Sequence, residues 1–204
     1  MVTESLDEKT LMEFWTEFVN WEKRRQGEDG FFARQLRAHG CRSVFDVGCG
    51  DGFDAIELAK RGFEVTANEI NQVFKEEAKR NARVQGVDIA FTPGYDWRDL
   101  AQNLSGALFD AVLCVGNSLT YMMTRYDQDI ALYNFSSILK QGGVLIVDHR
   151  NYDYMLGDRR SILENPHKNF KFSRKFYYCG ETIDGYPIKI EDDWVVMEYF
   201  HKTS

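Results

Sequence analysis

A glycine-rich segment that follows a short apolar run constrains the fold of this chain more than any other feature. The run Ser43–Val47 has the character of a buried strand, and it leads into Asp46-Val-Gly48-Cys-Gly50-Asp-Gly52. Glycines in the turn between a first strand and its helix let a ligand approach the backbone closely. A dinucleotide-binding loop would place its third glycine at Phe53, and a phosphate-binding P-loop would need Gly-Lys-Ser/Thr. The segment therefore predicts a ligand site between a strand and a helix, of neither of these two kinds.

Strand and helix patterns alternate along the central part of the chain. Strands are expected at Ser43–Val47, Phe63–Ala67, Val87–Phe91, Phe109–Val115 and Val144–Val147. Helices are expected at Asp54–Arg61, Val73–Val84 and Tyr126–Leu139, the last of them ended by Gly142-Gly143. Such alternation with short connections favours an α/β fold with a doubly wound, mostly parallel sheet and right-handed crossovers.

The two ends of the chain have a different pattern. The first forty residues predict two helices, one with Leu11, Phe14 and Phe18 at helical spacing and one at Phe31–Ala38. Three strands without helices between them are expected at Phe170–Cys179, Tyr186–Ile190 and Trp194–His201. We therefore predict an N-terminal helical cap at 1–40, an α/β core at 41–150 and a C-terminal antiparallel appendage at 151–204.

The overall charge and the apolar runs exclude several classes of partner. The chain has 25 Lys and Arg against 32 Asp and Glu, a net charge of −7, which suits neither nucleic acid nor an anionic membrane. No apolar run approaches the ~20 residues of a membrane helix, and the N-terminus lacks the apolar stretch of a signal peptide. We expect a cytoplasmic protein with no nucleic-acid and no membrane partner. The four cysteines, Cys41, Cys49, Cys114 and Cys179, form no C-x-x-C pair, so we expect small core residues rather than disulfides or metal ligands.

The glycine-rich segment resembles the D-x-G-x-G-x-G motif of class I S-adenosylmethionine (SAM) methyltransferases. The resemblance implies a Rossmann-like methyltransferase core that binds SAM and releases S-adenosylhomocysteine (SAH). The cofactor-binding residues that it implies in this region are Asp46, Gly48, Cys49, Gly50, Gly52 and Val115. Glu69 stands 21 residues after Gly48, at the end of the second expected strand, where an acid can accept both ribose hydroxyls of an adenosine. The alternative for Glu69 is a solvated surface acid.

Two further segments agree with a SAM site. In this superfamily an acidic or amide side chain after the third strand often bonds the adenine amino group, and its neighbour packs on the ring. Asp96 and Trp97 match those roles, and the alternative is a turn residue beside a half-buried Trp. Arg24 follows the first helix and has the fork geometry to pair with the methionine carboxylate. Its alternative is a solvated cation at a helix end.

Two motifs after the fourth and fifth strands resemble those of glycine and glycine/sarcosine N-methyltransferases. They are Val115-Gly-Asn117-Ser118-Leu-Thr-Tyr121 and Asp148-His-Arg150-Asn151-Tyr152-Asp153-Tyr154. The resemblance implies a small amino acid substrate, glycine or sarcosine, in a route toward betaine. It also implies that Asn117 and Arg150 hold this substrate, with the guanidinium forked onto the carboxylate. The alternatives are a turn residue for Asn117 and a salt bridge to a neighbouring Asp for Arg150.

Three tyrosines are further candidates for the substrate side. Tyr121 follows the fourth strand, and Tyr177 and Tyr178 fall in the appendage, from which tyrosines close the substrate site of the resembling family. The last two are equally well explained as core residues. The family usually continues past the appendage with a helix and an antiparallel strand pair, which nothing after Trp194 supplies. Two alternatives follow: the sheet lacks its last strands, or the last strands of this chain are reassigned.

The resemblance leaves other functions open. One is a class I methyltransferase for a different small molecule. Another is a SAM-binding protein with little turnover. The resemblance is compatible with a homo-oligomer and implies no metal site.

Overall fold

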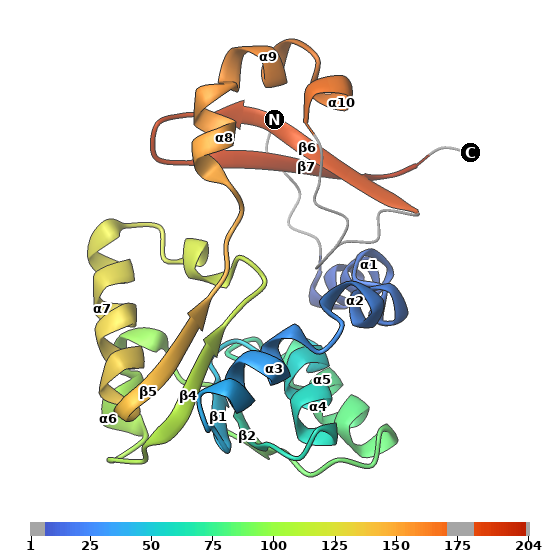
Figure 1. The fold of residues 1–204 in the computed structure, drawn as a ribbon. Coiled ribbons are helices and arrows are strands. Elements are labelled where there is room, and N and C mark those ends of the chain that lie inside the picture. Colours follow the sequence, from blue (N-terminus) through green and yellow to red (C-terminus); the bar gives the residue numbers. More distant parts are fainter. Residues whose placement is uncertain (1–6, 171–181, 203–204) are drawn as a thin grey trace. The chain divides into compact units, whose positions relative to one another are not determined.

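The computed structural model describes residues 7–170 and 182–202 of the 204-residue chain (Figure 1). The chain divides into two compact units, one formed by residues 1–29 with 150–204 and the other by residues 30–149. The division into a cap at 1–40, a core at 41–150 and an appendage at 151–204 stays a prediction. Among the described helices, none is both long and apolar enough to cross a membrane.

The unit formed by residues 30–149 is built on a parallel sheet in the order β3-β2-β1-β4-β5. Its strands are β1 (Ser43–Asp46), β2 (Glu64–Ala67), β3 (Ala90–Phe91), β4 (Phe109–Cys114) and β5 (Leu139–Val147). The order reverses direction at β1, which pairs with β2 on one side and β4 on the other. The predicted doubly wound parallel sheet is therefore confirmed, with the carboxyl ends of β1 and β4 beside each other at the switch point.

One helix of this unit precedes β1, and the others lie between the strands. They are α3 (Phe31–Ala38), α4 (Phe53–Lys60), α5 (Gln72–Val84), α6 (Leu100–Asn103) and α7 (Arg125–Ser137), with 3-10 turns η1 (Trp97–Asp99) and η2 (Ser118–Tyr121). Local capping explains where two of them begin. The Asn71 side chain accepts from the N–H groups of Val73 and Phe74 at the start of α5, and the Thr124 hydroxyl accepts from Asp127 N–H at the start of α7. One face of the sheet packs on α7 through the buried side chains of Phe45, Val112 and Phe135.

The boundary between α7 and β5 differs from the prediction. Gly142 and Gly143 do not end the helix, because α7 stops at Ser137 and both glycines lie within β5. The pairing register of β5 with β4 shifts between Phe109 and Ala111. A Cβ at Gly143 would lie 3.0 Å from the backbone oxygen of Asp110, so the glycine permits a close approach at this irregularity.

Asp110 joins the beginnings of three strands. Its carboxylate accepts from the backbone N–H groups of Arg42 and Ser43, from the Ser43 hydroxyl and from Lys140 Nζ. The hydrogen bond from Lys140 and the two backbone N–H groups hold the pKa of Asp110 well below its usual range. The carboxylate therefore ties β1, β4 and β5 together at the edge of the sheet that lies opposite the glycine-rich loop.

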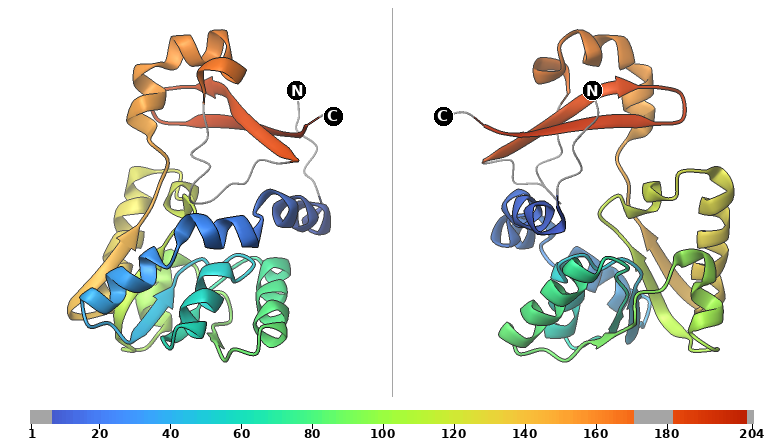
Figure 2. Two further views of the ribbon diagram at one scale, coloured as in Figure 1. Left: turned by 45° about the vertical axis from the view of Figure 1, so that its right-hand side comes forward. Right: turned by 180° about the vertical axis from the view of Figure 1, so that it is seen from behind.

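The other unit contains five helices among the described residues and one antiparallel hairpin. The helices are α1 (Glu8–Phe18), α2 (Trp21–Glu28), α8 (Tyr152–Gly157), α9 (Arg159–Glu164) and α10 (Pro166–Asn169). The hairpin pairs β6 (Ile183–Ile190) with β7 (Val195–His201). Figure 2 shows α9 and α10 on the hairpin, where Ile162, Phe170 and Ile190 form a buried cluster with Met155.

Several predictions for this unit are wrong. Between residue 7 and β1 the structure has three helices rather than two, because Asn20 caps a separate helix by accepting from Lys23 N–H. Three short helices stand between residues 152 and 169, where none is predicted; Asn151 and Asn165 cap two of them. The predicted antiparallel strands Tyr186–Ile190 and Trp194–His201 are confirmed as β6 and β7. The predicted strand Phe170–Cys179 lies, beyond Phe170, outside the described residues.

Candidate functional site

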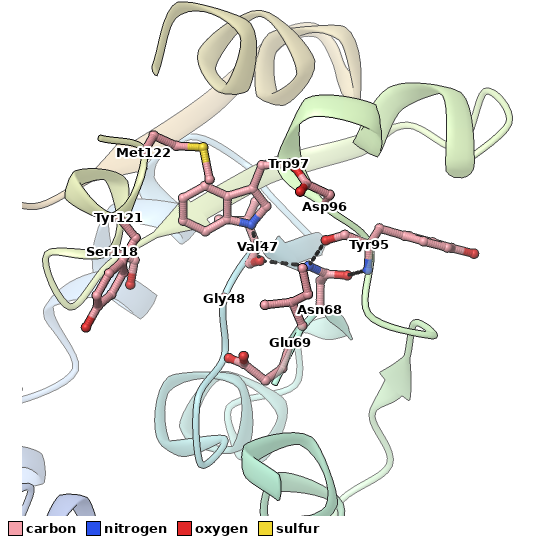
Figure 3. A pocket seen from close by; sticks show the side chains of 11 residues that line it. Val47, Gly48, Asn68, Glu69, Tyr95, Asp96, Trp97, Ser118, Tyr121 and Met122 are labelled. Carbon is pink, nitrogen blue, oxygen red and sulfur yellow. Dashed lines mark hydrogen bonds between the residues drawn. The ribbon is translucent and has the colours of Figure 1, made fainter. Parts of the chain in front are cut away.

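A cleft opens at the carboxyl ends of β1 and β2, next to the glycine-rich loop (Figure 3). Its volume is about 190 Å³. Five residues that the sequence predicts for the site line it: Gly48, Glu69, Asp96, Trp97 and Tyr121. Six others line it as well: Val47, Asn68, Ile70, Tyr95, Ser118 and Met122. All of them belong to residues 30–149, so one unit alone forms this cleft.

The glycine-rich loop and Glu69 are joined directly. Gly50 N–H donates to Glu69 Oε2 at 2.9 Å, and Asn71 N–H donates to Oε1 at 2.9 Å. Gly50 has φ +55°, and a Cβ built there would meet no heavy atom within 4 Å. The Glu69 carboxylate is therefore held in one orientation against the loop, and open space lies beside Gly50. Each carboxylate oxygen keeps acceptor capacity for one more donor.

The environment of Glu69 opposes its ionisation in part. Burial raises the pKa of Glu69, while the N–H groups of Asn71 and Gly50 and the charge of Lys75 act in the opposite direction. The net effect is a raised pKa. Glu69 is half-buried and accepts two backbone N–H groups, which favours a site residue over a solvated surface acid.

Trp97 forms one wall of the cleft. Its side chain is 9% exposed, and its indole Nε1 donates to the backbone oxygen of Val47 at 2.6 Å. A Cβ at Gly48 would lie 3.2 Å from Trp97 Cζ2, so the glycine also makes room for the indole ring. The ring packs edge-on against Phe135. The cleft wall is therefore anchored both to the end of β1 and to α7.

Asp96 stands beside Trp97 at the rim of the cleft. Its carboxylate accepts from Arg98 Nε at 3.0 Å and from Arg98 Nη2 at 2.6 Å. These side-chain hydrogen bonds lower the pKa of Asp96. Asp96 is therefore an ionised acceptor whose direction is set by a neighbouring guanidinium.

Asn68 is a site residue that the sequence reasoning missed. Its Nδ2 donates to the backbone oxygens of Val47 and Tyr95, both at 3.0 Å, and its Oδ1 accepts from Tyr95 N–H and from the Thr92 hydroxyl. All four hydrogen-bonding positions of the amide are used. The signal in the sequence was an amide directly before Glu69 at the end of an apolar strand.

The remaining predicted residues of the loop lie around the cleft but do not line it. Asp46 Oδ1 accepts from Gly48 N–H at 3.3 Å, and Gly52 has φ +91° at the start of α4. Cys49 is buried, and burial with nearby carboxylates raises the pKa of its thiol. The backbone oxygen of Val115 accepts from the Ser118 hydroxyl at 2.7 Å. Cys41, Cys49 and Cys114 are buried, as predicted for small core residues, and Cys179 lies outside the described residues.

Asn117 lies at the end of β4 with a left-handed backbone, φ +66°. Its N–H donates to Asp148 Oδ1 at 3.1 Å, and its Nδ2 donates to the Thr120 hydroxyl at 3.0 Å. Non-glycine residues with positive φ are uncommon and often mark functional sites. Tyr121 follows in the same turn and is 73% exposed.

Arg150 and Arg24 belong to the other unit. Arg150 Nη2 donates to the hydroxyl of Tyr199 on β7, and its guanidinium lies 6.0 Å from the centre of that ring. Arg24 is only 6% exposed, so the alternative of a solvated cation is wrong. The convergence of Arg150 with Asn117 stays a prediction, and Tyr177 and Tyr178 lie outside the described residues.

Comparison with known proteins places this geometry in a family. Residues 44–143 match the family described as "Methyltransferase domain". A glycine/sarcosine N-methyltransferase of Aphanothece halophytica is 34% identical over 189 residues, which are 93% of this chain and 67% of that protein. A glycine/sarcosine N-methyltransferase of Parasynechococcus marenigrum (strain WH8102) is 34% identical over 185 residues, 91% of this chain and 62% of that protein.

The fold has a counterpart among solved structures. A SAM-dependent methyltransferase from Clostridium acetobutylicum ATCC 824 superposes with a TM-score of 0.65 at 21% identity, over 96% of this chain and 75% of that one. This likeness confirms the predicted Rossmann-like methyltransferase fold. The two N-methyltransferases confirm the family that the motifs after β4 and β5 indicate. The chain belongs to the SAM-dependent methyltransferases and, within them, to the family of glycine/sarcosine N-methyltransferases.

Proposed function

We propose that this protein transfers a methyl group from SAM to the amine of glycine or sarcosine, and that SAH is the second product. The observation that carries the proposal is similarity along nearly the whole chain to two glycine/sarcosine N-methyltransferases. The chain spans 67% and 62% of the length of these relatives, so the activity of the complete relatives comes to this chain as a proposal.

The cleft fits the adenosine half of SAM. Glu69 offers two carboxylate oxygens to the ribose hydroxyls, and Asp96 offers an acceptor to the adenine amino group. Trp97 and the apolar residues that line the cleft enclose the adenine ring. The volume of about 190 Å³ is below the ~300–1,000 Å³ of pockets that enclose a whole ligand, which supports a nucleoside here and the methionine half along the loop.

Gly50 and the open space beside it leave room for the methionine half. Arg24 is the proposed partner of its carboxylate, because a guanidinium can donate two parallel hydrogen bonds to a carboxylate. SAM supplies a methyl group bound to a positively charged sulfur, which an amine attacks in line. The protein has to hold the amine and the methyl group in contact, and this positioning accounts for most of the rate.

Asn117 and Arg150 hold the amino acid substrate in this proposal. A guanidinium forked onto the carboxylate directs the amine, and the Asn117 side chain holds the amine or the second carboxylate oxygen. Tyr121, Tyr177 and Tyr178 enclose the substrate. The amine attacks in its unprotonated form, which the solvent supplies without a dedicated base.

Transfer of a labelled methyl group tests the proposal. The protein is incubated with methyl-labelled SAM and, separately, glycine, sarcosine, dimethylglycine and an amine without a carboxylate. Label in sarcosine or dimethylglycine is the expected result. SAM binding without transfer to any of these acceptors would favour a SAM-binding protein with little turnover. Transfer only to the amine without a carboxylate would favour a methyltransferase for another small molecule.

A further inference from the structure

A buried lysine, Lys75, lies near the cleft without lining it. Lys75 belongs to α5, and only 4% of its surface is exposed. Burying an ammonium group is costly unless it has specific partners. Its Nζ donates to the backbone oxygen of Pro93. Lys75 therefore binds the residues that lead into the cleft wall. We call these residues, Thr92–Trp97, the adenine-side segment.

Gly94 shows how closely the parts of the chain approach at this point. It has φ +102°, and a Cβ there would lie 2.7 Å from the backbone oxygen of Glu69 and 3.2 Å from Lys75 Nζ. The end of β2, the first turns of α5 and the adenine-side segment therefore meet with no room for a side chain. This contact lies directly behind the ribose side of the cleft.

Asn68 holds the same segment at a second point. It bonds both the N–H and the backbone oxygen of Tyr95, while Lys75 bonds Pro93 two residues earlier. Between them, Gly94 N–H donates to the Thr92 hydroxyl, which in turn donates to Asn68. Asp96 and Trp97 follow directly. Their position relative to Glu69 therefore depends on these two polar side chains.

We propose that Lys75 is a positioning residue of the cofactor site, which holds the adenine-side segment against the end of β2 so that Asp96 and Trp97 meet the adenine while Glu69 meets the ribose. The inference rests on the proposed function, because it assumes that adenosine occupies the cleft. Lys75 does not line the cleft. It acts through Pro93 and through its charge.

The charge of Lys75 also matters for Glu69. Burial raises the pKa of Glu69, and Lys75 opposes that rise together with the N–H groups of Asn71 and Gly50. The other charged groups around the loop are the buried carboxylates of Asp46 and Asp51, which with Glu69 also act on the Cys49 thiol. Without Lys75, Glu69 would take up a proton at a higher pH, and a protonated Glu69 accepts ribose hydroxyls less well.

Replacement of Lys75 by an apolar side chain of similar length tests the inference. SAH affinity is measured by titration calorimetry for Lys75→Met and for the matched control Lys79→Met, between about pH 5 and pH 8. Lys79 lies one turn further along α5 and pairs with Glu76 at 2.9 Å, away from the cleft. We expect SAH to bind roughly tenfold more weakly to Lys75→Met at neutral pH, from the loss of one charged hydrogen bond. We also expect its affinity to fall at a higher pH than in the control.

Different results would overturn the inference about Lys75 and the proposed function. Equal SAH affinity of Lys75→Met and Lys79→Met at every pH would overturn the inference. Failure of the unmodified protein to bind SAH would refute the proposed function and this inference with it. Gly94→Ala perturbs the same contact from the segment side and serves if Lys75→Met does not fold. It should weaken SAH binding as well, and unchanged binding in Gly94→Ala would contradict the inference.

Discussion

Replacement of Glu69 by glutamine should weaken SAH binding through the loss of charge at one defined position. In the structure, Gly50 N–H and Asn71 N–H each donate to one oxygen of the carboxylate at 2.9 Å. The two oxygens therefore face the loop and retain acceptor positions for two ribose hydroxyls. Glutamine keeps only one oxygen, and its NH₂ group would oppose one of the two backbone N–H donors.

The magnitude follows from the hydrogen bonds that are lost. Hydrogen bonds to a charged group contribute about 1.5–3 kcal/mol each, and the substitution removes one acceptor and the charge on the other. We expect a loss of about 2–3 kcal/mol, which is roughly a 30- to 150-fold rise in the dissociation constant. Glu64→Gln is the matched control, since Glu64 is exposed and begins β2, the strand that leads to Glu69.

Titration calorimetry with SAH gives the affinities, and thermal unfolding checks that both variants are folded. The pH dependence gives a second readout. Because burial raises the pKa of Glu69, SAH affinity of the unmodified protein should be full above that pKa and should fall as the pH drops through it. This dependence should disappear in Glu69→Gln. An unchanged dissociation constant in Glu69→Gln would refute the ribose assignment.

Three further predictions concern other parts of the chain. Gly50→Val should abolish SAH binding, because its side chain would enter the open space beside the loop; Gly40→Val, with a similar φ of +70° outside the site, should still bind SAH in calorimetry. Arg150→Lys should lower methyl transfer to glycine at least about tenfold without changing SAH affinity, because lysine loses the planar fork, and an equal loss of both would indicate a structural role instead. Asp110→Asn should lower the free energy of unfolding by about 1–3 kcal/mol at neutral pH, since the native pKa of Asp110 is depressed and its stabilisation is present above the unfolded-state pKa. The difference in the free energy of unfolding between the unmodified protein and Asp110→Asn, measured with denaturant, should shrink as the pH falls toward the native pKa of Asp110. A difference that stays constant with pH would contradict this prediction.

The parts of the fold that could be predicted are those whose signal is local. The glycines at 48, 50 and 52 and the acid at Glu69 have a fixed spacing that needs no knowledge of the rest of the chain. The apolar run Phe109–Val115 is a strand covered on both faces, and such a run can be recognised by itself. The helices after β5 were missed because short helices depend on caps such as Asn151 and Asn165, which resemble ordinary loop residues.

The parts that could not be predicted depend on contacts distant in sequence. Gly142 and Gly143 look like the end of a helix, and only the register shift opposite Phe109 and Ala111 makes them part of β5. The roles of Asn68 and Lys75 are of the same kind. The purpose of a buried polar residue cannot be identified until the backbone groups that it bonds, here at Tyr95 and Pro93, are known.

The sequence by itself determined the family, the parallel sheet and the side of the sheet on which the ligand site lies, because motif spacing and hydrophobic period are properties of neighbouring residues. Only the tertiary structure decided how Glu69, Asp96 and Trp97 are held around one cleft. Their positions depend on hydrogen bonds between the ends of β1 and β2 and the adenine-side segment, which lie far apart in the sequence. Such contacts are specified by the backbone geometry of distant segments, and no local pattern encodes them.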